Sequence, residues 1–222
     1  MCDELEYLAR DYADIAEVFT IGRSVEGRQI LGIKIAGDMR SERPLLRPQV
    51  KFSANIHGDE AVCREMLIGL ARYLVASINL TLTELSRALC EQYEFDKEIT
   101  ALLDRCELHL LPSLNPDGAC RKTRTNANKK DLNRCFPDWS SLGARDNVLE
   151  DREPEVAAVI RHLASNNFVL SADFHDGWTM VTFPWDDSPA CTDIENAVCE
   201  EDDTFYDLAL SYAYNHSFMY KG

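Results

Sequence analysis

The chain has 222 residues, of which 45% are hydrophobic, so it can bury a full core and has the composition of a globular protein. Its 38 acidic and 23 basic residues give a formal net charge of −15, which argues against nucleic acid or an anionic membrane as a partner. It contains no run of about 18 apolar residues, so we expect no membrane span, and its N-terminus lacks the features of a signal peptide.

Helical and strand patterns alternate in the first half of the chain. The elements predicted there are a helix over 3–12, strands over 18–21 and 30–35 joined as a hairpin, a strand over 50–54, and a helix from 60 to about 77. The strand over 50–54 rests on the alternation of Val50, Phe52 and Ala54 with polar residues. Residues 79–97 are ambiguous, with a helical piece expected over 84–89.

The second half continues the alternation. The predicted elements are a short helix ending near 103, strands over 107–111, 168–174 and 180–183, a helix from Pro154 to about 166, and a final helix over 205–214. Residues 114–139 are rich in polar side chains and show little periodicity, which is typical of either a solvated loop or a working surface. This order of elements predicts one α/β domain with a mostly parallel sheet.

Two predicted strands end close to a histidine. His57 follows the strand over 50–54, and His175 follows the strand over 168–174. In such sheets ligands bind outside the carboxyl ends of the strands. His57-Gly-Asp-Glu60 also has the residue types of two zinc ligands. A His and a Glu at this spacing occur by chance in many proteins, and hydrogen-bonded core histidines are the alternative explanation.

Five motifs in order resemble one family. They are His57-Gly-Asp-Glu60, Asn115-Pro-Asp-Gly118, Arg124-x-Asn-Ala-Asn128, Asp131-Leu-Asn-Arg134 and Ser171-Ala-x-x-His175. Together they resemble the zinc metallocarboxypeptidases, specifically the carboxypeptidase N/E/D subfamily. The resemblance implies a three-layer α/β/α fold with a mixed, largely parallel central sheet. It also implies one Zn²⁺ per chain, held by His57, Glu60 and His175.

The same resemblance implies roles in substrate binding. Asn133 and Arg134 match the pair that holds the substrate's terminal carboxylate, and a planar guanidinium suits that task. Arg124 matches the arginine that polarises the scissile carbonyl, with Arg121 as a nearby competitor for the role. Asp186 matches the acid that receives a C-terminal Lys or Arg. We therefore expect removal of single C-terminal residues, with basic residues preferred, from peptides or proteins.

Some features depart from the family pattern. The general-base Glu of the family is expected beyond residue 222, so we expect residues 1–222 to be a single, incomplete catalytic domain whose C-terminal part is missing. Asp176 stands where the family has a glycine after the metal-binding histidine, and we expect it to add a charge beside the zinc. Lys129 also replaces a glycine.

Two alternatives stay open beside the active peptidase. One is an inactive relative that binds zinc or peptide C-termini, and the other is a zinc amidohydrolase of the deacylase type. Asp186 and the complete Asn-Pro-Asp-Gly and Asp-Leu-Asn-Arg signatures favour the peptidase and its inactive relative over the deacylase. The resemblance implies an extracellular or secretory location, for which Asn215-His-Ser217 offers one glycosylation acceptor pattern.

Overall fold

A computed structural model describes residues 2–39, 44–79, 95–137, 148–184 and 198–221. The chain divides into one compact unit over 1–137 and 145–176 and a second over 138–144 and 177–222, and we describe each unit separately. The expectation of a single domain over 1–222 stays a prediction. Within the described residues, none of the helices combines the length and the apolar character needed to cross a membrane.

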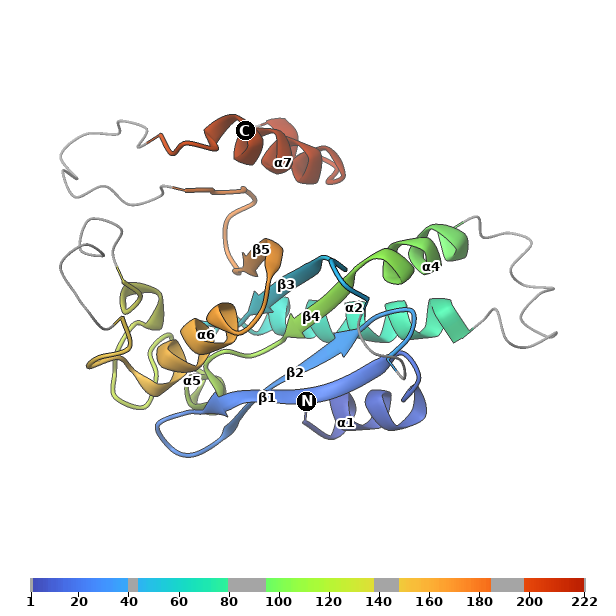
Figure 1. The fold of residues 1–222 in the computed structure, drawn as a ribbon. Coiled ribbons are helices and arrows are strands. Elements are labelled where there is room, and N and C mark those ends of the chain that lie inside the picture. Colours follow the sequence, from blue (N-terminus) through green and yellow to red (C-terminus); the bar gives the residue numbers. More distant parts are fainter. Residues whose placement is uncertain (1, 40–43, 80–94, 138–147, 185–197, 222) are drawn as a thin grey trace. The chain divides into compact units, whose positions relative to one another are not determined.

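The described part of the first unit is built on a five-stranded sheet with strand order β1-β2-β4-β3-β5 (Figure 1). The strands are β1 (Ala16–Arg23), β2 (Gln29–Ile35), β3 (Gln49–Ala54), β4 (Glu107–Leu111) and β5 (Phe168–Phe174). β1, β2 and β4 pair antiparallel, whereas β4, β3 and β5 run parallel, so the predicted mixed sheet is confirmed. Because Ala54 pairs with Phe174, the carboxyl ends of β3 and β5 lie side by side.

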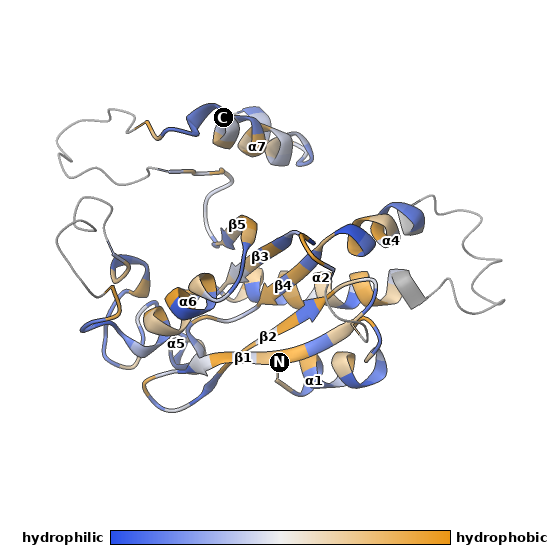
Figure 2. Ribbon diagram, viewed as in Figure 1, coloured by the Kyte–Doolittle hydropathy of each residue, from blue (hydrophilic) through white to orange (hydrophobic). Residues whose placement is uncertain are grey.

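Helices cover both faces of this sheet. They are α1 (Cys2–Asp11), α2 (Ala61–Asn79), α4 (Phe95–Arg105), α5 (Pro116–Arg121), α6 (Pro154–Ala164) and the short 3₁₀ helix η2 (Leu132–Arg134). Alternate side chains of β2 point to opposite faces: Ile33 and Ile35 join the core formed with α1, α2 and α4, whereas Ile30 joins the core formed with α6. Figure 2 shows the apolar strands between these helices. The three-layer α/β/α prediction is confirmed.

The polar segment over 114–139 contains two short helices that its sequence pattern did not reveal. Asn115 caps α5 by accepting a hydrogen bond from the backbone N–H of Gly118 at 2.9 Å, and Pro116 occupies the first turn. Asp131 caps η2 in the same way through the N–H of Asn133. Helices of three to six residues are too short to show an apolar periodicity, so only their capping residues could have indicated them.

In the second unit, the strand predicted over 180–183 is wrong, because these residues form neither helix nor strand and pair with no described strand. Their apolar, β-rich composition had suggested a strand, but a strand needs a hydrogen-bonded neighbour. The final helix is confirmed as α7 (Asp202–Tyr214), followed by the 3₁₀ helix η4 (Met219–Lys221). The helical piece predicted over 84–89 lies outside the described residues.

Candidate metal centre

The loop between β3 and α2 carries His57 and Glu60 and is shaped by a buried asparagine. Asn55 adopts a left-handed backbone conformation with φ of 55°, which asparagine tolerates better than most residues. Its Nδ2 atom donates hydrogen bonds to the carbonyl oxygens of His57 at 2.8 Å and Glu60 at 2.9 Å. Its Oδ1 atom accepts a hydrogen bond from the Ser113 hydroxyl at 2.7 Å. The turn at the end of β3 is therefore held from inside the protein.

A close backbone approach fixes the same loop from the other side. A Cβ atom on Gly58 would overlap the backbone of Gly118 and its neighbour in α5, so only glycine fits at position 58. Asn115 joins the two segments, because its Nδ2 donates to the carbonyl oxygen of Ile56 at 3.1 Å. The Asn-Pro-Asp-Gly motif thus supports the loop that bears His57.

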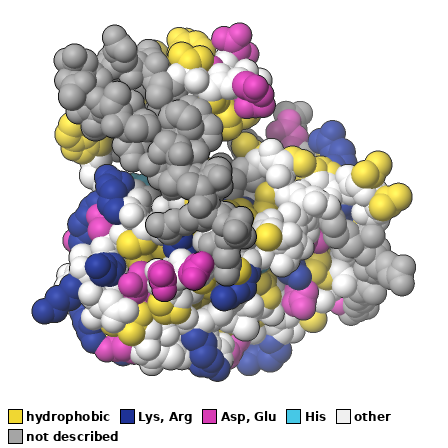
Figure 3. Space-filling view, turned by 60° about the vertical axis from the view of Figure 1, so that its left-hand side comes forward, with side chains coloured by type: hydrophobic (Ala, Val, Ile, Leu, Met, Phe, Trp, Pro, Cys, Tyr) yellow, Lys and Arg dark blue, Asp and Glu magenta, His cyan; other side chains and the backbone are white. Residues whose placement is uncertain are grey.

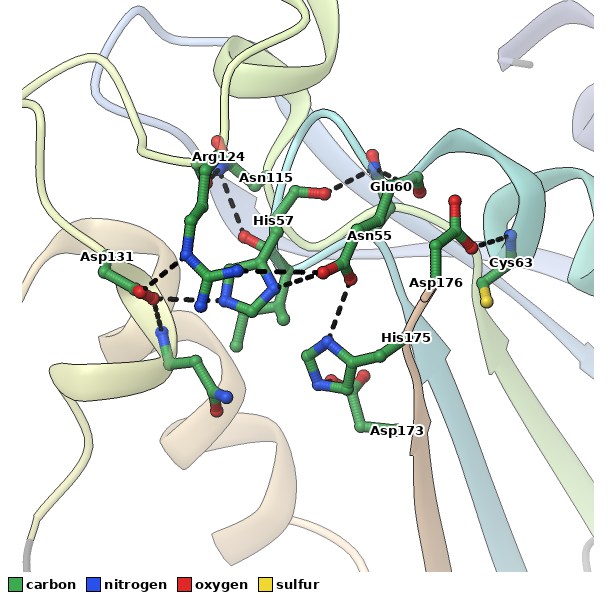
Figure 4. A network of polar contacts seen from close by, with 12 residues as sticks. Asn55, His57, Glu60, Cys63, Asn115, Arg124, Asp131, Asp173, His175 and Asp176 are labelled. Atoms are coloured by element: carbon green, nitrogen blue, oxygen red, sulfur yellow. Dashed lines mark hydrogen bonds and ion pairs between the residues drawn. The ribbon is translucent and has the colours of Figure 1, made fainter. Parts of the chain in front are cut away.

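Glu60 lies between the two strand-terminal histidines (Figure 4). Its Oε1 atom is 2.7 Å from Nδ1 of His57, and its Oε2 atom is 2.8 Å from Nδ1 of His175. One potential ligand atom from each of the three residues lies within 4.8 Å of the other two, and no other such group occurs among the described residues. Two imidazole nitrogens and a carboxylate oxygen are a typical donor set for catalytic zinc, so these residues fit that ion.

Each histidine is also held through its second ring nitrogen. Nε2 of His57 is 3.2 Å from Oδ1 of Asp131, and Nε2 of His175 is 3.2 Å from Oδ2 of Asp173. A carboxylate at Nε2 favours the tautomer with its proton there and leaves the Nδ1 lone pair free for a metal. The contact with Asp173, with a smaller contribution from Glu60, raises the pKa of His175 to about 9. Zinc must therefore displace a proton from His175 when it binds.

Arg124 reaches this cluster, whereas Arg121 does not. Nε of Arg124 lies 3.0 Å from Oδ2 of Asp131, and its Nη1 atom lies 3.9 Å from Oε1 of Glu60. Burial alone would raise the pKa of Asp131, but the hydrogen bond from Arg124, the nearby charges of His57 and Arg124 and the N–H of Asn133 together outweigh it, and the pKa is lowered. Arg121 instead forms an ion pair with Glu26 at the tip of the β1–β2 hairpin. The guanidinium of Arg124 is about half exposed beside the candidate metal centre.

Asn133 and Arg134 lie on η2, directly after Asp131. The backbone N–H of Asn133 donates to Oδ1 of Asp131 at 3.0 Å, the same oxygen that faces His57. Arg134 is exposed, and its guanidinium donates a hydrogen bond to the carbonyl oxygen of Asn133. The structure thus connects η2 to the cluster through Asp131. Asp186, the fourth residue predicted to contact substrate, lies outside the described residues.

Sequence reasoning assigned no role to Asn55, Asp131 or Asp173, although all three contact the loop or the ligands. Asp131 belongs to a motif that was recognised, but its motif gave no indication that its carboxylate would face His57. Asp173 lies two residues before His175, and on a strand these two positions share a face. That alternation is the one local signal that could have identified Asp173.

Among the described residues, the histidines at 109, 162 and 216 belong to no group of potential metal ligands. His109 is fully buried, with Nε2 2.6 Å from Oε1 of Glu107 and Nδ1 3.3 Å from Nε2 of His162. His216 accepts hydrogen bonds from the backbone of the turn that follows α7. Burial lowers the pKa of His162 to about 4, with smaller contributions from His109, Lys51 and Lys34. Each of the three therefore has a partner within its own part of the fold.

Comparisons with known proteins agree with the motifs. The family model for zinc carboxypeptidases (Peptidase_M14) matches residues 1–222. Carboxypeptidase M of Mus musculus is 36% identical over 229 residues, which cover 98% of this chain and 47% of that protein. Carboxypeptidase D of Drosophila melanogaster is 36% identical over 233 residues, covering 97% of this chain and 15% of that protein. The chain therefore spans about half, or less, of the length of these relatives.

Solved structures show the same fold. The carboxypeptidase A of Helicoverpa armigera superposes with a TM-score of 0.67 at 20% sequence identity, over 95% of this chain and 51% of that one. At this level of identity the likeness concerns the fold alone.

Proposed function

Because the chain belongs to the zinc carboxypeptidase family, we propose that it forms the metal-binding part of a carboxypeptidase site that removes single C-terminal residues from peptides or proteins. His57, Glu60 and His175 are the proposed zinc ligands. The observation that carries the proposal is the convergence of Nδ1 of both histidines on the two carboxylate oxygens of Glu60.

Zinc, the ion of this family, supplies Lewis acidity toward a carbonyl oxygen and a water molecule when bound. The protein's own residues orient the substrate. Arg124, with its exposed guanidinium beside Glu60, is proposed to donate to the oxygen of the scissile carbonyl as negative charge develops there. Asn133 and Arg134 are proposed to hold the terminal carboxylate, for which a guanidinium offers two parallel N–H donors.

We further propose that basic C-terminal residues are preferred, through Asp186. A cationic side chain that leaves water needs a counter-charge, and the subfamily resemblance assigns that task to this position. The net charge of −15 also favours the approach of cationic peptides. On the face shown in Figure 3, however, acidic and basic side chains are intermingled, so the specificity proposal rests on Asp186.

Zinc binding is tested on the purified chain by equilibrium dialysis and metal analysis. We expect one zinc ion per chain, and little binding by His57→Ala or His175→Ala. His216→Ala is the matched control, because that histidine lies in the turn after α7 and is expected to leave zinc binding unchanged. Failure of the wild-type chain to bind zinc, or retention of full affinity by both ligand variants, would contradict the proposed metal centre.

Substrate recognition is tested on the zinc-loaded chain with peptides that differ in their last residue. We expect a peptide ending in Arg to bind more tightly than one ending in Phe, and an amidated peptide to bind weakly. Arg134→Lys should weaken binding of the free-acid peptide, because an ammonium cannot form the bidentate contact. Asp186→Asn should reduce the difference between Arg and Phe. Mass spectrometry of the same mixtures detects whether the peptide loses one residue. Equal binding of the free-acid and amidated peptides would contradict the proposal that Asn133 and Arg134 hold the terminal carboxylate.

We also propose an extracellular or secretory location, on the basis of the resemblance to this family. Asn215 is exposed and begins an Asn-His-Ser pattern at the end of α7. A protein that enters the secretory route can be glycosylated there. The protein isolated from its own cells should lose mass when it is treated with an endoglycosidase. The absence of this mass loss in Asn215→Gln would support glycosylation at Asn215 and therefore this location.

A further inference from the structure

Asp176 directs its carboxylate away from the histidine it follows. Its Oδ2 atom accepts a hydrogen bond from the backbone N–H of Val62 at 3.0 Å, and its Oδ1 atom accepts one from the N–H of Cys63 at 3.0 Å. Figure 4 shows Asp176 turned toward the start of α2, while His175 faces Glu60. The sequence predicts a charge beside the zinc, and the structure shows that this carboxylate is hydrogen-bonded to the start of a helix.

The first turn of α2 needs such a partner. The first backbone N–H groups of a helix have no acceptor within the helix and are commonly satisfied by the side chain of the residue just before it. Here that residue is Glu60, whose two carboxylate oxygens face His57 and His175. The first turn of α2 contains no acidic residue of its own. A carboxylate from another segment therefore caps the helix, at the end where the helix dipole favours negative charge.

The two hydrogen bonds join the segments that carry two of the proposed ligands. The ladder between β3 and β5 ends at the pair Ala54 and Phe174, before His175 is reached. Beyond that pair, Asp176, which directly follows His175, is hydrogen-bonded to Val62 and Cys63, the two residues that follow Ala61 in α2. Glu60 and His175 are 115 residues apart in the chain, so their separation depends on contacts of this kind.

We infer that Asp176 is a positioning residue that sets the distance between Glu60 and His175 and so increases the affinity of the site for its ion. The inference rests on the proposed metal centre. Asp176 acts through the backbone, because both of its carboxylate oxygens accept hydrogen bonds from N–H groups of α2. Its loss should leave all three ligands present but less well placed, and partners of metal ligands typically contribute about 10- to 100-fold to metal affinity.

Zinc affinity of the whole chain, measured by competition with a chromophoric chelator, tests this inference. We expect Asp176→Gly to bind zinc about 10- to 100-fold more weakly than the wild type. Asp176→Asn should be intermediate, because its amide oxygen can accept one of the two hydrogen bonds. The visible absorption of bound cobalt(II), which reports ligand geometry, should shift in Asp176→Gly.

Val75→Ala is the matched control, since Val75 is buried in α2 far along the helix from its first turn. It should lower the midpoint of thermal unfolding without changing zinc affinity or the cobalt spectrum. The inference is overturned if Asp176→Gly binds zinc as the wild type does, or if Val75→Ala weakens binding equally. Should Asp176→Gly fail to fold, Asp176→Asn decides by the same criteria. Absence of binding by the wild type would instead refute the proposed metal centre itself.

Discussion

Asn55 donates a hydrogen bond from Nδ2 to the carbonyl oxygen of Glu60 at 2.9 Å, which closes the loop between β3 and α2 around His57. The same nitrogen reaches the carbonyl oxygen of His57. One fully buried side chain therefore holds the backbone of two proposed ligands, and it does so from a left-handed conformation.

Two replacements of Asn55 should distinguish the stability contributed by its hydrogen bonds from the cost of its left-handed backbone conformation. Asn55→Gly keeps the left-handed conformation but loses the buried hydrogen bonds, so we expect a loss of about 1–3 kcal/mol in the free energy of unfolding. Asn55→Ala should lose about 1 kcal/mol more, because alanine is strained at positive φ. Urea unfolding measures both variants, and zinc affinity should fall in both. An alanine variant more stable than the glycine variant would contradict this account.

Gly58 and Gly69 should respond in opposite directions to the same change. Gly58→Ala would push a methyl group into the backbone of Gly118, so it should destabilise the fold by at least about 2 kcal/mol and weaken zinc binding. Gly69 lies in the middle of α2, and nothing lies within 4 Å of its added Cβ. Gly69→Ala should therefore stabilise the protein by about 0.5–1 kcal/mol. Thermal unfolding of the two variants beside the wild type checks the signs.

Lys129 is held in a conformation that favours glycine. Its φ of 60° is left-handed, and its backbone N–H donates to the carbonyl oxygen of Asn126 at 3.0 Å. A residue with a side chain costs about 1–2 kcal/mol at positive φ, which is more than the entropy that a glycine loses on folding. Lys129→Gly should therefore stabilise the protein by roughly 0.5–1 kcal/mol. Lys130→Gly, at an exposed neighbour without positive φ, is the control and should be destabilising. Equal effects of the two changes in urea unfolding would refute the prediction.

His162 should make the protein less stable in acid. It packs against Phe19 and Phe168 and faces His109, and burial lowers its pKa to about 4 from the ordinary value of 6.5. The unfolded chain therefore binds a proton at a higher pH than the folded protein. The stability contribution is present above pH 6.5 and is lost as the pH falls toward 4.

After a discount for partial exposure, this loss is on the order of 2 kcal/mol by pH 4. His162→Gln should flatten the fall in unfolding free energy between pH 6.5 and 4, and NMR titration should place the His162 pKa well below 6.5. His216→Gln, in an exposed turn, is the control. An unchanged pH dependence in His162→Gln would contradict the assignment.

Local sequence was sufficient for most of the elements that position the site. The strands over 107–111 and 168–174 have the predicted bounds, because short apolar, β-rich runs favour strands. The first is buried at every position, whereas most positions of the second are exposed or half-buried. His57, Glu60 and His175 could be grouped from the sequence alone, since each follows a predicted strand or begins a predicted helix and the motifs occur in a characteristic order. The fold brings their ligand atoms within 4.8 Å of one another. Their role as zinc ligands stays a proposal that metal analysis will test.

Tertiary structure alone decided the rest. No local pattern showed that β4 lies between β2 and β3, that the segment over 180–183 has no partner strand among the described residues, or that Arg124 rather than Arg121 reaches the cluster. The same holds for the two hydrogen bonds through which Asp176 caps α2. The physical reason is common to all four cases. Periodicity in the sequence indicates which side of a helix or strand is buried. It does not indicate which strand pairs with a given strand edge, or which group binds a given guanidinium or carboxylate, because those partners are distant in the chain.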